Sequence, residues 1–161
     1  SNILTPSPYD FNEHRSYQHQ SLTTRGTVEF RSSCAQPIAD TFTVAAFHLG
    51  LMVELPAFTE LIESHPFYED YGRDYKQLRR RFAAQQLSDE EVNDVAMFAK
   101  DLLDLATSGL EKRGFGEAVY LSALYQRIAS KQNPALISLK LFETGKTLSE
   151  ISEIFANEKD F

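Results

Sequence analysis

A long amphipathic segment in the middle of the chain constrains the fold more than any other feature. Ser88 and Glu91 have the spacing of a capping box, in which the two residues satisfy each other's backbone at the start of a helix. Apolar residues then recur three and four positions apart, on one face of a helix: Val92, Val95, Ala96, Ala99, Leu102, Leu103, Ala106 and Leu110. The pattern predicts one long helix that packs this face against other helices.

Further helix signals lie on both sides of this segment. Pro37 suits the first turn of a helix that is apolar nearly all round, is expected to be buried on most sides and should run to about Leu55. The residues between Phe67 and Gly72 are predicted to be a connection. Shorter helices are predicted over residues 56–63, 75–82, 120–128, 134–145 and 147–155. The prediction is a mainly α (α+β) fold, a bundle of about six helices attached to one β-strand.

The one clear strand signal is a strictly alternating run from Thr24 to Arg31. In a strand, the side chains of Arg25, Glu29 and Arg31 would line one face, because successive side chains point to opposite faces. Residues 1–23 are polar and show no periodicity, so they are predicted to form an irregular lead-in, and Ser1-Asn2 is typical of a tag remnant. The predicted domain spans residues 24–161.

Composition excludes several classes of partner. The chain has 161 residues and a formal net charge of −7, which argues against nucleic acid or an anionic membrane surface as a general partner. No run approaches the roughly 18 apolar residues that a membrane span needs. A single cysteine cannot form an internal disulfide, and this favours a reducing, cytoplasmic compartment.

An ordered set of motifs resembles a known enzyme family. A Glu29-x-Arg31 strand is followed by a loop that ends Ala35-Gln36-Pro37 and then by an Ala-rich helix with a late glycine. Far downstream come a segment over residues 116–127 and an Asn-Pro-Ala turn over residues 133–135. This order resembles the glutamate–cysteine ligase branch of the glutamine synthetase superfamily, with its related bacterial carboxylate–amine ligases. The resemblance covers roughly Arg25 to Ala135.

The resemblance implies a chemistry and a set of site residues. Such ligases use ATP to phosphorylate a substrate carboxylate, here of glutamate, and an amine then displaces the phosphate; cysteine is the family's usual amine, and another small amine is possible. Glu29 would be a ligand of Mg²⁺ or Mn²⁺, and Arg31 would be catalytic by clamping the substrate carboxylate or acyl phosphate. Arg25 would bind substrate from the same face. Cys34 departs from the family, where aspartate is common, and Gln36 is predicted to stabilise the loop.

The resemblance also implies that the chain is the C-terminal part of a larger catalytic domain. One strand cannot build the family's catalytic sheet, so the missing N-terminal part would supply most of the site, and the fragment alone is expected to be inactive. An open strand edge is a template for pairing, so self-association through residues 20–31 is expected. The alternative is a non-catalytic helical interaction module, in which the Glu29–Arg31 strand is only structural.

Overall fold

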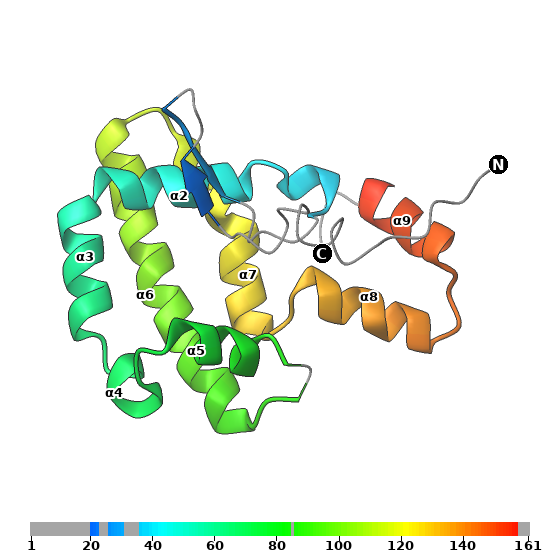
Figure 1. Cartoon of the computed structure of the whole chain (residues 1–161). Coiled ribbons are helices and arrows are strands. Elements are labelled where there is room, and N and C mark those ends of the chain that lie inside the picture. The colour runs from blue at the N-terminus through cyan, green and yellow to red at the C-terminus, as the bar shows by residue number, and fades with distance from the viewer. Residues whose placement is uncertain (1–19, 23–25, 31–35, 85, 158–161) are drawn as a thin grey trace, which may run out of the picture. The chain divides into compact units, whose positions relative to one another are not determined.

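A computed structural model of the chain describes residues 20–22, 26–30, 36–84 and 86–157. The chain divides into two units, Ser1–Ala35 and Gln36–Phe161, and each unit is considered by itself. The described residues are mostly helical, which confirms the predicted class at that level (Figure 1).

The first unit contains a short antiparallel strand pair. Strand β1 (Gln20–Leu22) pairs with β2 (Val28–Phe30), and Ser21 lies opposite Glu29. Strand β1 falls within the segment that was predicted to be irregular, and it pairs with a strand of its own chain. The predicted strand is therefore too long at its start, because Gly26, with a φ of 76°, lies in a bend and Thr27 is not part of a strand. Thr24, Arg25 and Arg31 lie outside the described residues, so one strand attached to the helices stays a prediction.

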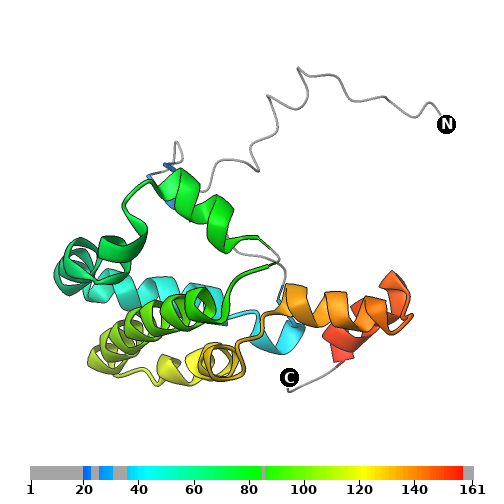
Figure 2. The ribbon, with the colours of Figure 1, turned by 90° about the horizontal axis from the view of Figure 1, so that it is seen from below.

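The second unit is helical throughout. Eight α-helices and two 3₁₀ helices are described in it, rather than about six helices, and they follow one another in this order: η2 (Ile38–Asp40), α2 (Thr43–Val53), α3 (Leu55–Ser64), α4 (Phe67–Tyr71), α5 (Tyr75–Phe82), α6 (Asp89–Arg113), η3 (Glu117–Leu121), α7 (Ser122–Ser130), α8 (Pro134–Glu143) and α9 (Leu148–Asn157). Both views show α8 and α9 side by side, on the far side of α7 from α3 (Figure 1, Figure 2).

None of the described helices is long and apolar enough to cross a membrane alone. The segments Ile38–Val53 and Leu55–Ser64 meet the criteria of length and composition only when they are taken together, and they are bent by 92°.

Helix α6 confirms the long amphipathic helix. Ser88 Oγ accepts a hydrogen bond from the Glu91 backbone N–H, and a Glu91 carboxylate oxygen accepts one from the Ser88 N–H at 2.7 Å. Leu103 and Leu110 on the apolar face are buried. The helix ends at Gly114, whose φ of 73° is a conformation that glycine adopts without strain.

The predicted helix from Pro37 to about Leu55 is interrupted near its start. A 3₁₀ turn, η2, precedes α2, and the hydroxyls of Thr41 and Thr43 donate to the carbonyl oxygens of Ile38 and Asp40 near this break. Such local bonds compete with a regular helix. Most residues of α2 are buried or half-buried, as predicted, and Met52 near its end is exposed.

The predicted connection over Phe67–Gly72 is in fact helix α4. Phe67 is buried, and its ring stacks on the ring of Phe98 from α6 with the centroids 4.9 Å apart. Gly72, with a φ of 74°, then ends the helix. Tertiary packing of the aromatic rings therefore stabilises a helix too short to show a helical repeat in the sequence.

The crossing of α2 and α6 forms the centre of the core (Figure 1). A Cβ atom built on Gly50 of α2 would lie 2.1 Å from the Ala106 carbonyl oxygen of α6, and one built on Gly109 would lie 2.1 Å from the Gly50 carbonyl oxygen. The two helix backbones are therefore in direct contact, and only glycine fits at these two positions. Buried apolar side chains surround the crossing: Ala46, Leu51, Leu103, Leu110 and Leu121.

A carboxylate joins the same two helices at the end of α2. Glu54 is 8 % exposed, and its Oε1 atom accepts a hydrogen bond from Ser108 Oγ at 3.2 Å and pairs with the Lys112 ammonium group. The bond to Lys112 is the main reason that the pKa of Glu54 lies below its ordinary value of 4.5. The folded protein thus stabilises the charged form of Glu54.

We expect Gly109→Ala to lower the free energy of unfolding by about 3 kcal/mol or more, because the methyl group meets the backbone of α2. The matched control is Gly114→Ala on the same helix, where a Cβ meets nothing within 4 Å. It should lose only about 1–2 kcal/mol, from the left-handed conformation of that position. Urea unfolding followed by circular dichroism measures both. A Gly109→Ala variant as stable as Gly114→Ala would contradict the backbone contact.

The lowered pKa of Glu54 predicts a specific loss of stability in acid. A carboxylate whose pKa is depressed by folding stabilises the fold above its unfolded pKa of 4.5, and this contribution is lost as the pH falls through the folded value. In urea unfolding between about pH 6 and pH 3, Glu54→Gln should therefore lose less stability than the unmodified protein. The exposed Glu63→Gln is the control and should follow the unmodified protein. Identical curves for all three proteins would contradict the role of Glu54.

Candidate functional site

Most of the site residues predicted from sequence lie outside the described residues. Glu29 lies at the centre of β2, where its backbone pairs with that of Ser21, but its side chain is not described. Arg25, Arg31 and Cys34 are outside the described ranges. The site that can be built from side chains is therefore a different one, in the helical unit.

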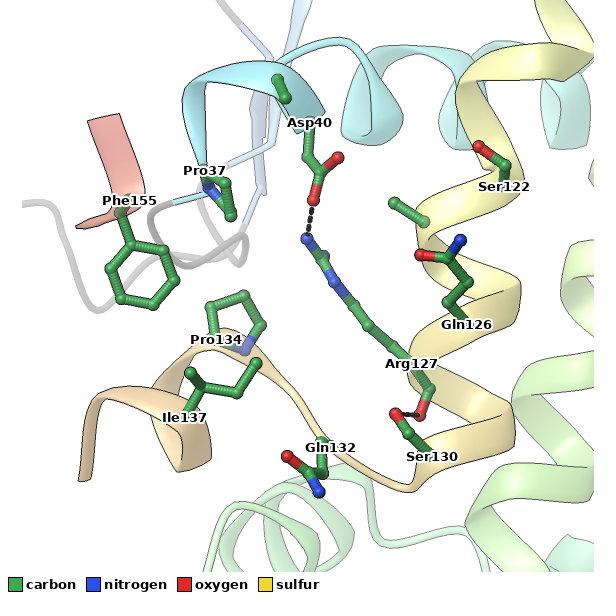
Figure 3. A pocket seen from close by; sticks show the side chains of 12 residues that line it. Pro37, Asp40, Ser122, Gln126, Arg127, Ser130, Gln132, Pro134, Ile137 and Phe155 are labelled. Carbon is green, nitrogen blue, oxygen red and sulfur yellow. Dashed lines mark hydrogen bonds and ion pairs between the residues drawn. The ribbon is translucent and has the colours of Figure 1, made fainter. Parts of the chain in front are cut away.

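This site is a pocket of about 490 Å³ between η2, α7, the start of α8 and α9 (Figure 3). Its volume is within the range of small-molecule sites. Its lining combines charged, amide, hydroxyl and apolar side chains from four elements: Pro37, Ala39, Asp40, Ser122, Ala123, Gln126, Arg127, Ser130, Gln132, Pro134, Ile137 and Phe155.

An arginine–aspartate pair crosses the pocket. Arg127 Nη2 of α7 lies 2.6 Å from Asp40 Oδ2 of η2, and each side chain is only 18 % exposed. The other terminal nitrogen, Nη1, donates to Gln36 Oε1 at 2.5 Å. One guanidinium group therefore fixes both η2 and the residue that precedes Pro37. Charge-assisted bonds of this kind are stronger than neutral hydrogen bonds.

The turn between α7 and α8 shapes the wall below the ion pair. Lys131, with a φ of 53°, ends α7 in the left-handed conformation, and the Gln132 N–H donates to the Arg127 carbonyl oxygen at 3.1 Å. The Asn133 side chain accepts from the Leu136 N–H at 2.9 Å and so caps α8, with Pro134 in its first turn. Pro134 is buried and lines the pocket. These local hydrogen bonds hold the start of α8 close to the end of α7.

Three segments that carry the sequence resemblance meet in this pocket. Pro37 closes the Ala-Gln-Pro loop, Arg127 ends the segment over residues 116–127, and Pro134 belongs to the Asn-Pro-Ala turn. Gln36 was predicted to stabilise its loop; its side chain accepts a hydrogen bond from Arg127, which is 91 residues away.

Sequence reasoning missed Asp40 and Arg127 as partners. One signal was available, because Asp40 is the only acidic or basic residue between Arg31 and Glu54, if histidine is left aside. A lone carboxylate in an apolar segment needs a partner when it is withdrawn from water.

A second, more open hollow lies between α3 and α6, and its wall includes Asp101 and Asp104. Both carboxylates already have partners within the protein. Asp101 lies 3.1 Å from His65 Nε2, and Asp104 accepts from Lys100 Nζ at 2.5 Å and from the Tyr125 hydroxyl at 2.8 Å. Across the part of the chain that the structure describes, no group of three or more metal-binding side chains occurs.

Comparison with known proteins found no match: no family model, no curated protein and no solved structure corresponds to this chain. The function is therefore argued from the residues and their geometry.

Because Arg127 pairs with Asp40, we expect substitution of Arg127 to destabilise the protein more than substitution of another paired arginine. Arg127→Gln should lower the free energy of unfolding by about 2 kcal/mol, because it leaves the Asp40 carboxylate in the pocket without its charged partner. The control is Arg113→Gln, whose guanidinium pairs at 3.0 Å with Glu117, four positions along the chain and less buried than Asp40. A partly exposed pair of that kind contributes about 1 kcal/mol or less. Equal losses for the two variants in urea unfolding would contradict a special role for Arg127.

Proposed function

We propose that this chain is the C-terminal part of the catalytic domain of an ATP-dependent carboxylate–amine ligase of the glutamate–cysteine ligase type. The observation that carries the proposal is the convergence of the resembling segments. Pro37 is about 90 positions from Arg127 and Pro134 in the sequence, yet all three line one pocket, and Arg127 bonds the side chain of Gln36 next to Pro37. A chance match of scattered motifs has no reason to assemble in this way.

The reaction assigned to the complete enzyme joins glutamate to cysteine or to another small amine. ATP phosphorylates the carboxylate of glutamate, and the amine then displaces the phosphate. In the proposal, Arg31 holds the substrate carboxylate or acyl phosphate through the planar guanidinium fork, and Arg25 supplies a second positive charge for substrate binding. The proposed compartment is the cytoplasm.

Glu29 supplies the ligand type that this chemistry needs. Mg²⁺ and Mn²⁺ bind carboxylate oxygens, and they neutralise phosphate charge when bound. One carboxylate is an incomplete ligand set, and the described residues bring no group of three metal-binding side chains together. The remaining ligands are assigned to the missing N-terminal part of the catalytic domain.

The helical unit has a supporting part in this proposal. Gln36 follows Arg31 by five positions in the sequence, and the bond from Arg127 holds Gln36, the first residue of the helical unit. The proposal therefore gives Arg127 a positioning role, through its bond to Gln36.

A non-catalytic interaction module remains the second candidate, and one observation favours it. Phe42, Val119 and Tyr120 are exposed, and the rings of Phe42 and Tyr120 have their centroids 5.5 Å apart. Adjacent exposed apolar side chains are typical of a surface that another protein covers. Measurement of activity in the complete protein separates the two candidates.

In the complete enzyme, Glu29→Gln and Arg31→Lys should each lower kcat for ADP release with glutamate and cysteine. Loss of a preorganised charge contact typically reduces the rate by about 10²–10³. Excess Mg²⁺ or Mn²⁺ should partly restore Glu29→Gln, because the change weakens a metal ligand, but should leave Arg31→Lys unchanged. The 161-residue chain alone is expected to release no ADP above the background of its Glu29→Ala variant.

The exposed residues Glu63 and Arg79 provide matched controls for these experiments. Glu63→Gln and Arg79→Lys make the same chemical changes on the helices and should retain normal kinetics. Near-normal kinetics in Glu29→Gln and Arg31→Lys as well would contradict the ligase proposal and leave the strand with a structural role.

A further inference from the structure

The pocket around Arg127 retains hydrogen-bonding capacity that the described residues do not use. A guanidinium group carries more N–H donors than the bonds of Arg127 to Gln36 and Asp40 employ. The side chain of Asp40 accepts through Oδ2, and its Oδ1 atom accepts no hydrogen bond within the described part of the chain. Arg127 and Asp40 therefore lie side by side at the wall of a cavity, and each can form further hydrogen bonds.

The two sides of this ion pair differ in polarity. Figure 3 shows Pro37, Pro134, Ile137 and Phe155 on one side of Arg127, and Ser122 and Gln126 on the other. The apolar side has room for a hydrocarbon group, because the cavity measures about 490 Å³. A matching ligand carries two opposite charges close together and an apolar group next to them.

We infer that this pocket binds a free α-amino acid with an apolar side chain, of the size of leucine. The ligand carboxylate pairs with the Arg127 guanidinium group, and the ligand ammonium group pairs with the Asp40 carboxylate. The ligand groups use the N–H donors of Arg127 and the Asp40 Oδ1 atom that the internal ion pair leaves unused, so every charge in the pocket has a partner, which is the condition for charges in a low-dielectric site. The ligand side chain packs against Pro134, Ile137 and Phe155.

The same geometry disfavours an acidic amino acid. The side-chain carboxylate of glutamate would lie against Pro134, Ile137 and Phe155, and the described lining holds no second cation besides Arg127 to pair with it. The inferred ligand is therefore not the proposed substrate, and the inference does not depend on the proposed function. The test of this pocket measures binding and not turnover. A failure to bind leucine would therefore not contradict the ligase proposal, and an inactive enzyme would not contradict the pocket.

The test is a titration of the ¹⁵N-labelled 161-residue chain with L-leucine, followed by NMR. Saturable shifts are expected at the Arg127 Nε–H and at the backbone of Ser130 and Ile137, with a dissociation constant on the order of 1 mM. 4-Methylpentanoate lacks the ammonium group and 3-methylbutylamine lacks the carboxylate, so each should bind at least about tenfold more weakly. Glycine has no side chain to bury, so it should also bind at least about tenfold more weakly than leucine.

Variants provide a second arm of the test. The double change of Asp40→Asn with Arg127→Gln keeps polar groups of similar size and removes both charges, so leucine affinity should fall at least about tenfold. Arg113→Gln should leave the affinity unchanged. Where the double variant fails to fold by circular dichroism, the ligand series on the unmodified protein decides. Absence of saturable shifts with leucine, or equal binding of leucine and its two singly charged analogues, would overturn the inference.

Discussion

The helical unit depends on a contact between two backbones. At the crossing of α2 and α6, Gly50 and Gly109 bring main-chain atoms together at a distance that excludes any Cβ atom. Contacts as close as this have steep repulsive limits, so small shifts in packing are resisted strongly. Leu103 and Leu110 of α6 are fully buried around the crossing, and the bonds of Glu54 to Ser108 and Lys112 join the helices at the next turn.

The pocket follows from this crossing through the chain connections. Helix α2 begins two residues after Thr41, so fixing α2 against α6 also fixes η2 and Asp40. Helix α6 leads through η3 into α7, which carries Arg127, and η3 contacts both α2 and α6. The Asp40 carboxylate and the Arg127 guanidinium group therefore meet because one precedes α2, the other follows α6, and these two helices are packed against each other. The pair then positions Gln36, and a ligand that enters the pocket acts on the same bonds.

Local sequence signals predicted the helices whose ends are stabilised by bonds between neighbouring residues. The Ser88–Glu91 capping box and the apolar repeat predicted α6. A helix was likewise predicted over residues 147–155, and Thr147 and Glu150 form the bonds of a capping box at the start of α9. Helix α4 was missed, because the ring contact of Phe67 with Phe98 stabilises it from outside its own segment. The pairing of Arg127 with Asp40 was missed for the same reason, since a contact between residues 87 positions apart leaves no periodic pattern. The roles assigned to Glu29 and Arg31 rest on the family resemblance, and they stay predictions.

The most direct test of the backbone crossing is an NMR measurement of proton distances between α2 and α6. Selective labelling of glycine and alanine isolates the Hα protons of Gly50, Ala106 and Gly109. If the helices touch as the structure shows, strong nuclear Overhauser effects should connect Gly50 with both Ala106 and Gly109, because their main chains are in van der Waals contact. Absence of these cross-peaks, in spectra that show the sequential contacts within each helix clearly, would contradict the account.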